Sequence, residues 1–122
     1  MANKLIRNLD HRSVLHMADL VDYKPGKVAS LTLTQNPGVG ITLFAIDKGE
    51  GLSTHSAPGD AMAQVLEGKV EITIDGVTQT LTAGDTIVMP AEVPHALLAV
   101  EPFKFLLVVV KMEDEAYRWK FE

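Results

Sequence analysis

The fold is decided by the stretch GDTIVMPAEVPHA, residues 84–96. It opens on Gly84-Asp85, a turn signal, and continues with a short apolar run, residues 86–89, whose β-branched side chains are typical of a strand. The two prolines that follow have no backbone N–H to donate, so neither fits the middle of a central strand. The stretch therefore predicts a strand, a corner stiffened by proline, and a second strand that opens on His95.

A similar arrangement lies upstream. A strand-like run, residues 61–67, ends at Gly68, and His55 lies shortly before it. The sequence thus contains two pairs of predicted strands that are bounded by glycine or proline. Each pair has one histidine near its start.

The whole-chain composition narrows the class of protein. With 122 residues and 47% hydrophobic residues, one domain with a real core is expected. The net charge of −5 argues against nucleic acid or an anionic membrane surface as a partner, and no apolar run is long enough to span a membrane. The absence of cysteine excludes disulfides, thiolate metal sites and cysteine nucleophiles. Without an apolar leader, we expect a cytoplasmic protein.

The spacing of turn signals predicts an all-β fold. Apolar or alternating runs recur about every ten residues, which favours a sandwich or small barrel over a parallel α/β fold. Asp75-Gly76 is the strongest hairpin signal. We expect strands at 28–34, 41–46, 61–67, 69–74, 77–81, 86–89, 95–100 and 103–111, and an irregular polar segment at 52–60. The expected barrel core contains Val70, Ile72, Ile87, Leu106 and Val108.

The two ends of the chain carry weaker signals. Residues 1–27 are expected to form an N-terminal arm, with one helical turn or an edge strand near residues 14–21 and with His11 and His16 on the surface. In the C-terminal segment, residues 112–122, three aromatic side chains alternate and predict one aromatic face. That face either covers the barrel's own edge or packs on a second subunit. The aromatic residues are Tyr117, Trp119 and Phe121.

Two motifs in register resemble those of a small single-domain cupin. The first motif of that family is a glycine, His-x-His, a glutamate and a glycine, and the second is a glycine, five residues, a proline and Gly-x-x-His. The Asp75-Gly76 hairpin lies between them, as it does in cupins. The first motif's places hold Gly49, His55, Ala57, Ala61 and Gly68, where Val65-Leu66-Glu67-Gly68 is typical of the family, and the second motif's hold Gly84, Pro90, Glu92 and His95. The resemblance covers about residues 28–111 and implies a double-stranded β-helix, or jelly-roll, barrel that is often dimeric.

The departures from the motif bear on function. Metal-binding cupins use two histidines and a carboxylate from the first motif and one histidine from the second, but this chain has Ala57 and Ala61 at two of those places. One divalent ion (iron, manganese, nickel or zinc) held by His55 and His95 would need water, substrate or another side chain at its other positions. We therefore expect any metal to be weakly held. Asp60 is the candidate third ligand, because it lies just before the strand and can turn inward from the loop. Met62 and Gln64 are excluded, because strand alternation sends them to the face opposite Ala61.

Two readings of the histidine pair stay open. His55 and His95 are either a catalytic pair, as metal ligands or as acid and base, or hydrogen-bonded residues of a barrel mouth without a catalytic role. The alanines leave room for a small ligand in a pocket of Ala57, Asp60, Ala61 and Met89. We expect a small-molecule-binding cupin, as a metal-dependent isomerase or lyase or, alternatively, as a non-catalytic binding or sensor module. The resemblance and the terminal segments predict a homodimer built through outer sheet faces.

Overall fold

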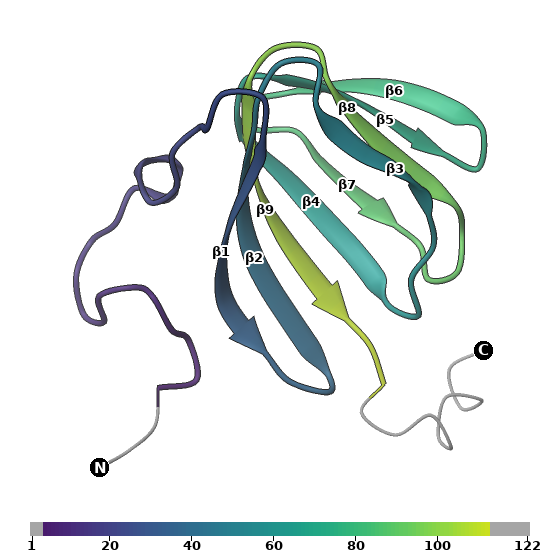
Figure 1. Cartoon of the computed structure of the whole chain (residues 1–122). Helices are drawn as coiled ribbons and strands as arrows, with labels where there is room; N and C mark the ends of the chain where they lie inside the picture. Colours follow the sequence, from purple (N-terminus) through teal and green to yellow (C-terminus); the bar gives the residue numbers. More distant parts are fainter. Residues whose placement is uncertain (1–3, 113–122) are drawn as a thin grey trace.

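Figure 1 shows the computed structural model, which describes residues 4–112 as two antiparallel sheets packed face to face. Neighbouring strands pair in antiparallel register throughout. This arrangement confirms the predicted all-β jelly-roll. One sheet has the order β1 (Val28–Gln35), β2 (Val39–Ile46), β9 (Phe103–Val110), β4 (Asp60–Glu67) and β7 (Thr86–Met89), and the other has β3 (Gly51–His55), β8 (His95–Ala99), β5 (Lys69–Ile74) and β6 (Val77–Thr82).

The main core lies between the two sheets. Strand alternation selects its members: on β4, Ala61, Ala63 and Val65 are buried, whereas the residues between them are exposed. Val70 and Ile72 of β5 are fully buried, as predicted. Other large members of this cluster are Ile46, Leu81, Met89, Leu97, Phe103 and Phe105, and the predicted core residue Ile87 packs against it half-buried.

One expected irregular segment is partly a strand. Residues Gly51–His55 form β3, which pairs with β8. Apolar alternation is missing here because β3 is an edge strand whose last three side chains are exposed. The pairing depends on backbone hydrogen bonds rather than on burial of side chains.

The sequence analysis placed the wrong face of β9 in the main core. Phe103 and Phe105 point into the main core, whereas Leu106 and Val108 are half-buried on the outer side of the same strand. A continuous apolar run does not show which face of its strand points into the core. β9 is apolar on both faces because the N-terminal arm covers part of its outer face.

The N-terminal arm runs across the outer face of β1 and β2 (Figure 1). It contains one short 3₁₀ turn, Met17–Asp19, within the range predicted for a helical turn or edge strand. The Arg7 N–H donates to Leu33 O (2.6 Å), which ties the start of the arm to β1. A second hydrophobic cluster forms beneath the arm; its buried members are Val21, Ala29, Leu33, Leu43 and Ala45.

A buried lysine fastens the arm to the sheet. Lys104, on the outer face of β9, is only 7% exposed, and its Nζ donates to Ala18 O at 2.6 Å. The same ammonium group lies 4.9 Å from the centre of the Tyr23 ring and 3.9 Å from the Glu67 carboxylate. The Tyr23 hydroxyl donates to Glu67 Oε2 at 2.8 Å. Burial, and then the hydrogen bond to Glu67, raise the pKa of Tyr23 above its ordinary value.

Removing the Lys104 ammonium group should loosen the arm. Lys104→Met keeps the apolar stem but leaves Ala18 O without its charged donor, so we expect the free energy of unfolding to fall by about 1–3 kcal/mol. Urea unfolding measures the change, with Lys27→Met, at an exposed position, as the matched control. Equal stability of the two variants would show that the Lys104 ammonium group does not help to hold the arm.

Within residues 4–112, the structure contains no helix of the length and apolarity that a membrane crossing requires. Of the C-terminal segment predicted to pack on the barrel or on a partner, residues 113–122 lie outside the described part of the chain.

Candidate functional site

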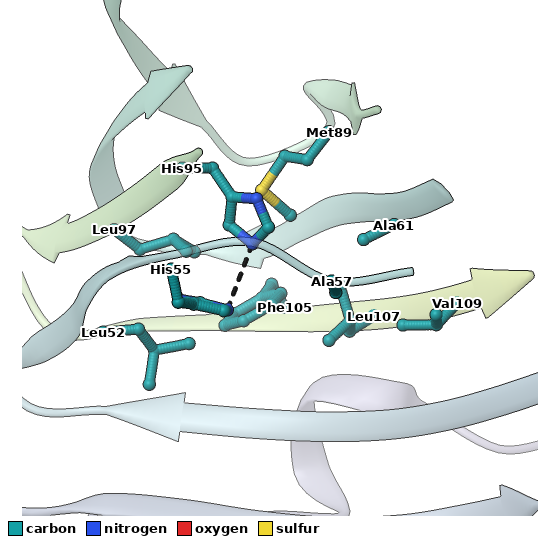
Figure 2. A pocket seen from close by; sticks show the side chains of 10 residues that line it. All are labelled: Leu52, His55, Ala57, Ala61, Met89, His95, Leu97, Phe105, Leu107 and Val109. Carbon is teal, nitrogen blue, oxygen red and sulfur yellow. Dashed lines mark hydrogen bonds between the residues drawn. The ribbon is translucent and has the colours of Figure 1, made fainter. Parts of the chain in front are cut away.

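The two predicted histidines meet because they are direct partners across two paired strands. His55 ends β3, His95 begins β8, and their Cα atoms are opposite one another in the antiparallel ladder. Their Nε2 atoms lie 3.1 Å apart, and the rings meet edge to face with centroids 4.3 Å apart (Figure 2). His95 is 5% exposed whereas His55 is exposed, so the pair connects the barrel interior with its mouth.

Backbone carbonyls orient both rings. His55 Nδ1 lies 2.9 Å from Ser53 O, and His95 Nδ1 lies 3.2 Å from Val93 O. A carbonyl oxygen only accepts hydrogen bonds, so a ring that donates to its carbonyl has its hydrogen on Nδ1 and leaves Nε2 as an acceptor. The hydrogen bond of 3.1 Å between the two Nε2 atoms needs a hydrogen on one of them. When neither Nε2 carries a hydrogen, both lone pairs can contact one cation.

The corner between β7 and β8 is fastened to the loop between β3 and β4. The Glu92 N–H donates to Ala57 O at 2.7 Å, and Asp60 Oδ1 accepts from the Ala91 N–H at 2.8 Å. Glu92 adopts a φ of 63°, the left-handed region that favours glycine, and glycine is the residue of the cupin motif at this place. These contacts hold the start of β8, and with it His95, against the loop that carries Ala57.

The pocket beside the histidine pair is small and largely apolar. Its cavity volume is about 70 Å³, several times the roughly 10–15 Å³ that a cavity needs to hold one water molecule. Ala57, Ala61 and Met89, predicted from the sequence, line it (Figure 2). Its other lining residues are His55, His95, Leu52, Leu97, Phe105, Leu107 and Val109.

Asp60, which the sequence analysis placed in the pocket, does not line it. It is exposed, and its carboxylate is engaged by the Ala91 N–H. The reason is strand alternation, because Asp60 precedes the inward-facing Ala61 on β4 and so faces the other way. Asp60 supports the loop of the site from outside rather than supplying a third ligand within it.

Sequence reasoning missed five lining residues. Leu97 could have been found, because it follows His95 by two residues on β8 and therefore shares its face. The three from β9 could not, because the apolar run of that strand shows no alternation.

The two imidazole nitrogens of His55 and His95 can hold a metal ion only loosely. At metal–nitrogen bond lengths of about 2.0–2.1 Å, one ion can contact two nitrogens that lie 3.1 Å apart. Across residues 4–112, however, no group of three or more histidine, cysteine, aspartate or glutamate side chains is placed to hold a metal. Two imidazoles thus fit part of a coordination sphere, and water or substrate oxygen would have to complete it.

Comparison with known proteins adds a family assignment. The family described as "Cupin domain" matches residues 42–110. No curated protein matches the chain.

Solved structures of similar proteins share the architecture. A conserved protein of unknown function from Streptococcus pyogenes is 48% identical, with a TM-score of 0.90, over 93% of this chain and 100% of that chain. A cupin superfamily protein from Desulfitobacterium hafniense is 30% identical, with a TM-score of 0.84, over 88% of this chain and 98% of that chain. Salicylate 1,2-dioxygenase from Pseudoaminobacter salicylatoxidans is 23% identical, with a TM-score of 0.64, over 68% of this chain and 26% of that chain, a likeness of fold alone.

Proposed function

The chain belongs to the cupin family, and on this basis we propose that it binds a small molecule at His55 and His95, as an isomerase or lyase that uses a weakly held divalent metal. The observation that carries the proposal is the pair of Nε2 atoms, 3.1 Å apart, at one end of a small apolar pocket. Among the described residues that line the pocket, the groups that could hold the ion are these two imidazoles.

The chain's own residues would divide the work. With the ion bound, both Nε2 lone pairs hold it and the two histidines position the ligand through it. Without the ion, one Nε2 lone pair accepts a proton from a polar group of the ligand. Ala57 and Ala61 leave space that the larger metal-binding side chains of other cupins would fill. The apolar wall excludes water from that end of the pocket. A bound divalent ion would supply Lewis acidity toward a ligand oxygen.

A second candidate function is a non-catalytic binding or sensor module. The small donor set favours it, because only two imidazoles line a pocket whose remaining walls are apolar. Such a module would hold a small acid or sugar derivative without any metal. The two candidates differ in one respect: a catalyst requires the ion or a reactive histidine, whereas a binder keeps its ligand affinity after the metal is removed.

Metal titration tests the shared site. Calorimetry with Mn²⁺, Ni²⁺ and Zn²⁺ on the metal-free protein should find one weak site, and His55→Ala or His95→Ala should each reduce its affinity at least about tenfold, or 1.4 kcal/mol. His16→Ala, which removes a histidine that does not line the pocket, is the matched control. Equal affinities in all three variants would contradict a two-histidine site.

The same samples separate the two candidates. Chelation of the parent protein should leave its melting temperature unchanged, because the core between the sheets does not include the ion. A thermal-shift screen of small acids and sugar derivatives is then run with and without added metal. Ligands that bind only with metal favour the enzyme, and ligands that bind equally well in both favour the binding module.

A homodimer and a cytoplasmic location remain proposals drawn from the sequence. The mass in solution, measured by light scattering at micromolar concentration, tests the dimer. A monomeric mass would rule it out.

A further inference from the structure

An apolar stripe crosses the outer face of the sheet that forms one wall of the pocket. Met62 on β4 is the register partner of Val88 on β7 and of Val108 on β9, so these three side chains form one row across three strands. Val110, further along β9, extends the row's apolar surface. Met62, Val88 and Val110 are 40%, 50% and 56% exposed. The stripe is defined here as Met62, Val88, Val108 and Val110.

The N-terminal arm covers only the other half of this face. Its apolar residues pack over β1 and β2, and the second hydrophobic cluster ends with Leu106 of β9 and Leu66 of β4. The stripe continues from that cluster toward the open edge strand β7. An apolar patch that extends a covered hydrophobic cluster is typical of an interaction surface.

The chain itself supplies a segment whose chemistry fits the stripe. Residues 113–122, outside the described part, include Tyr117, Trp119 and Phe121 at alternate positions, with Arg118 and Lys120 between them. In an extended segment, that alternation would place all three aromatic rings on one side and both cations on the other. Each ring can bury about 150–250 Å².

The direction of the chain at the end of β9 favours docking on a second copy. The Lys111 N–H donates to Gly38 O at 2.9 Å, so the chain still runs along the β1–β2 hairpin and past the end of the sheet. It therefore leaves in the direction away from Met62 and Val88. Ten further residues can extend roughly 33 Å, far enough to reach a neighbouring molecule.

We propose that residues 113–122 of one copy cover the stripe of a second copy, and that the exchange is reciprocal. Six aromatic rings, three from each copy, would bury on the order of 1,000 Å² together, which reaches the size of a specific interface. The contact is closed and two-fold. It rests on the homodimer proposed above and names the surfaces that form it. Because Met62 and Val88 alternate with Ala61 and Met89, each copy's tail would support the pocket wall of the other from behind.

Trp119 is the only tryptophan in the chain, so its fluorescence reports the position of the tail. Two proteins are made: one ends at Met112 and has an intact stripe but no tryptophan, and the other carries Val88→Lys and has an intact tail but a broken stripe. Each alone is expected to be monomeric, and Val88→Lys should show the red-shifted emission of a solvated indole. Val77→Lys, at an exposed apolar position on β6 of the other sheet, is the matched control and should behave as the parent.

Mixing the two altered proteins decides the matter. The truncated protein should shift the emission of the Val88→Lys protein to the blue, because the tail of one then docks on the stripe of the other. Circular dichroism of each protein checks that both are folded, and Met62→Lys repeats the experiment if Val88→Lys is not. An emission that stays red in the mixture overturns the proposal, and so does a blue emission in a monomeric parent, which would place the tail on its own stripe. If the truncated protein and the Val88→Lys protein are each still dimeric, the homodimer proposal stands but the interface proposed here is wrong.

Discussion

Replacing Gly68 by alanine is expected to prevent the protein from folding at ordinary temperatures. Gly68 joins β4 to β5 with a φ of +85°, a conformation that costs an L-residue about 1–2 kcal/mol. An added Cβ would also lie 2.6 Å from Phe103 Cα and would overlap the carbonyl oxygen of Pro102. Both obstacles belong to the backbone next to a fully buried phenylalanine, so neither can move cheaply. We expect a loss of more than about 4 kcal/mol, comparable with the whole stability of a small domain.

Gly49 provides the matched control for this change. Its φ is +83°, almost the same as that of Gly68, but a Cβ added there meets nothing within 4 Å. Gly49→Ala therefore isolates the cost of the backbone conformation, about 1–2 kcal/mol, and chemical unfolding of both variants separates it from the steric cost. If the two glycines tolerate alanine equally well, the close approach of β4–β5 to the start of β9 is not a constraint on the fold.

The sequence predicted those parts of the fold that depend on local signals. Turn glycines and the Asp75-Gly76 hairpin locate the ends of most strands, and β4 and β5 show their inner faces through period-two alternation. The glycine–histidine motifs added the topology, which no single strand could show. The position of His55 opposite His95 is a consequence of that topology.

Two of the failures have a common physical cause, which is that the sequence pattern did not distinguish one side of a strand from the other. β9 is apolar on both faces, because the main core lies on one side and the arm on the other, so the inward places of Phe105 and Leu107 were not visible. The last three residues of β3 are polar and exposed, so the strand shows no apolar alternation. Asp60 was misplaced for a different reason: it was treated as a loop residue free to turn inward, whereas it already belongs to β4 and its face is fixed.

The second large effect is expected from restoring the missing ligands. Ala57 and Ala61 line the same pocket as His55 and His95, whose Nε2 atoms face each other, and they stand at the places where metal-binding cupins carry a histidine and a glutamate. Ala57→His with Ala61→Glu would complete a set of three imidazoles and one carboxylate. We expect divalent metals to bind at least about a hundredfold more tightly, or about 3 kcal/mol, when manganese, nickel and zinc are titrated by calorimetry. The two larger side chains should also fill the cavity of about 70 Å³ and exclude any small molecule that the parent binds.

The control for that double variant keeps the added charge but not its position. Gln64→Glu places a carboxylate on the same strand, on the exposed outer face, and should leave metal affinity unchanged. Equal affinities in the parent and the double variant would show that the parent already has a third ligand. The Asp60 carboxylate would then have to release the Ala91 N–H and turn inward, and Asp60→Asn would weaken metal binding in the parent. If instead only the double variant binds tightly, the two alanines are the reason that the natural site holds a metal loosely. The space beside Ala57 and Ala61 is then available to the bound small molecule.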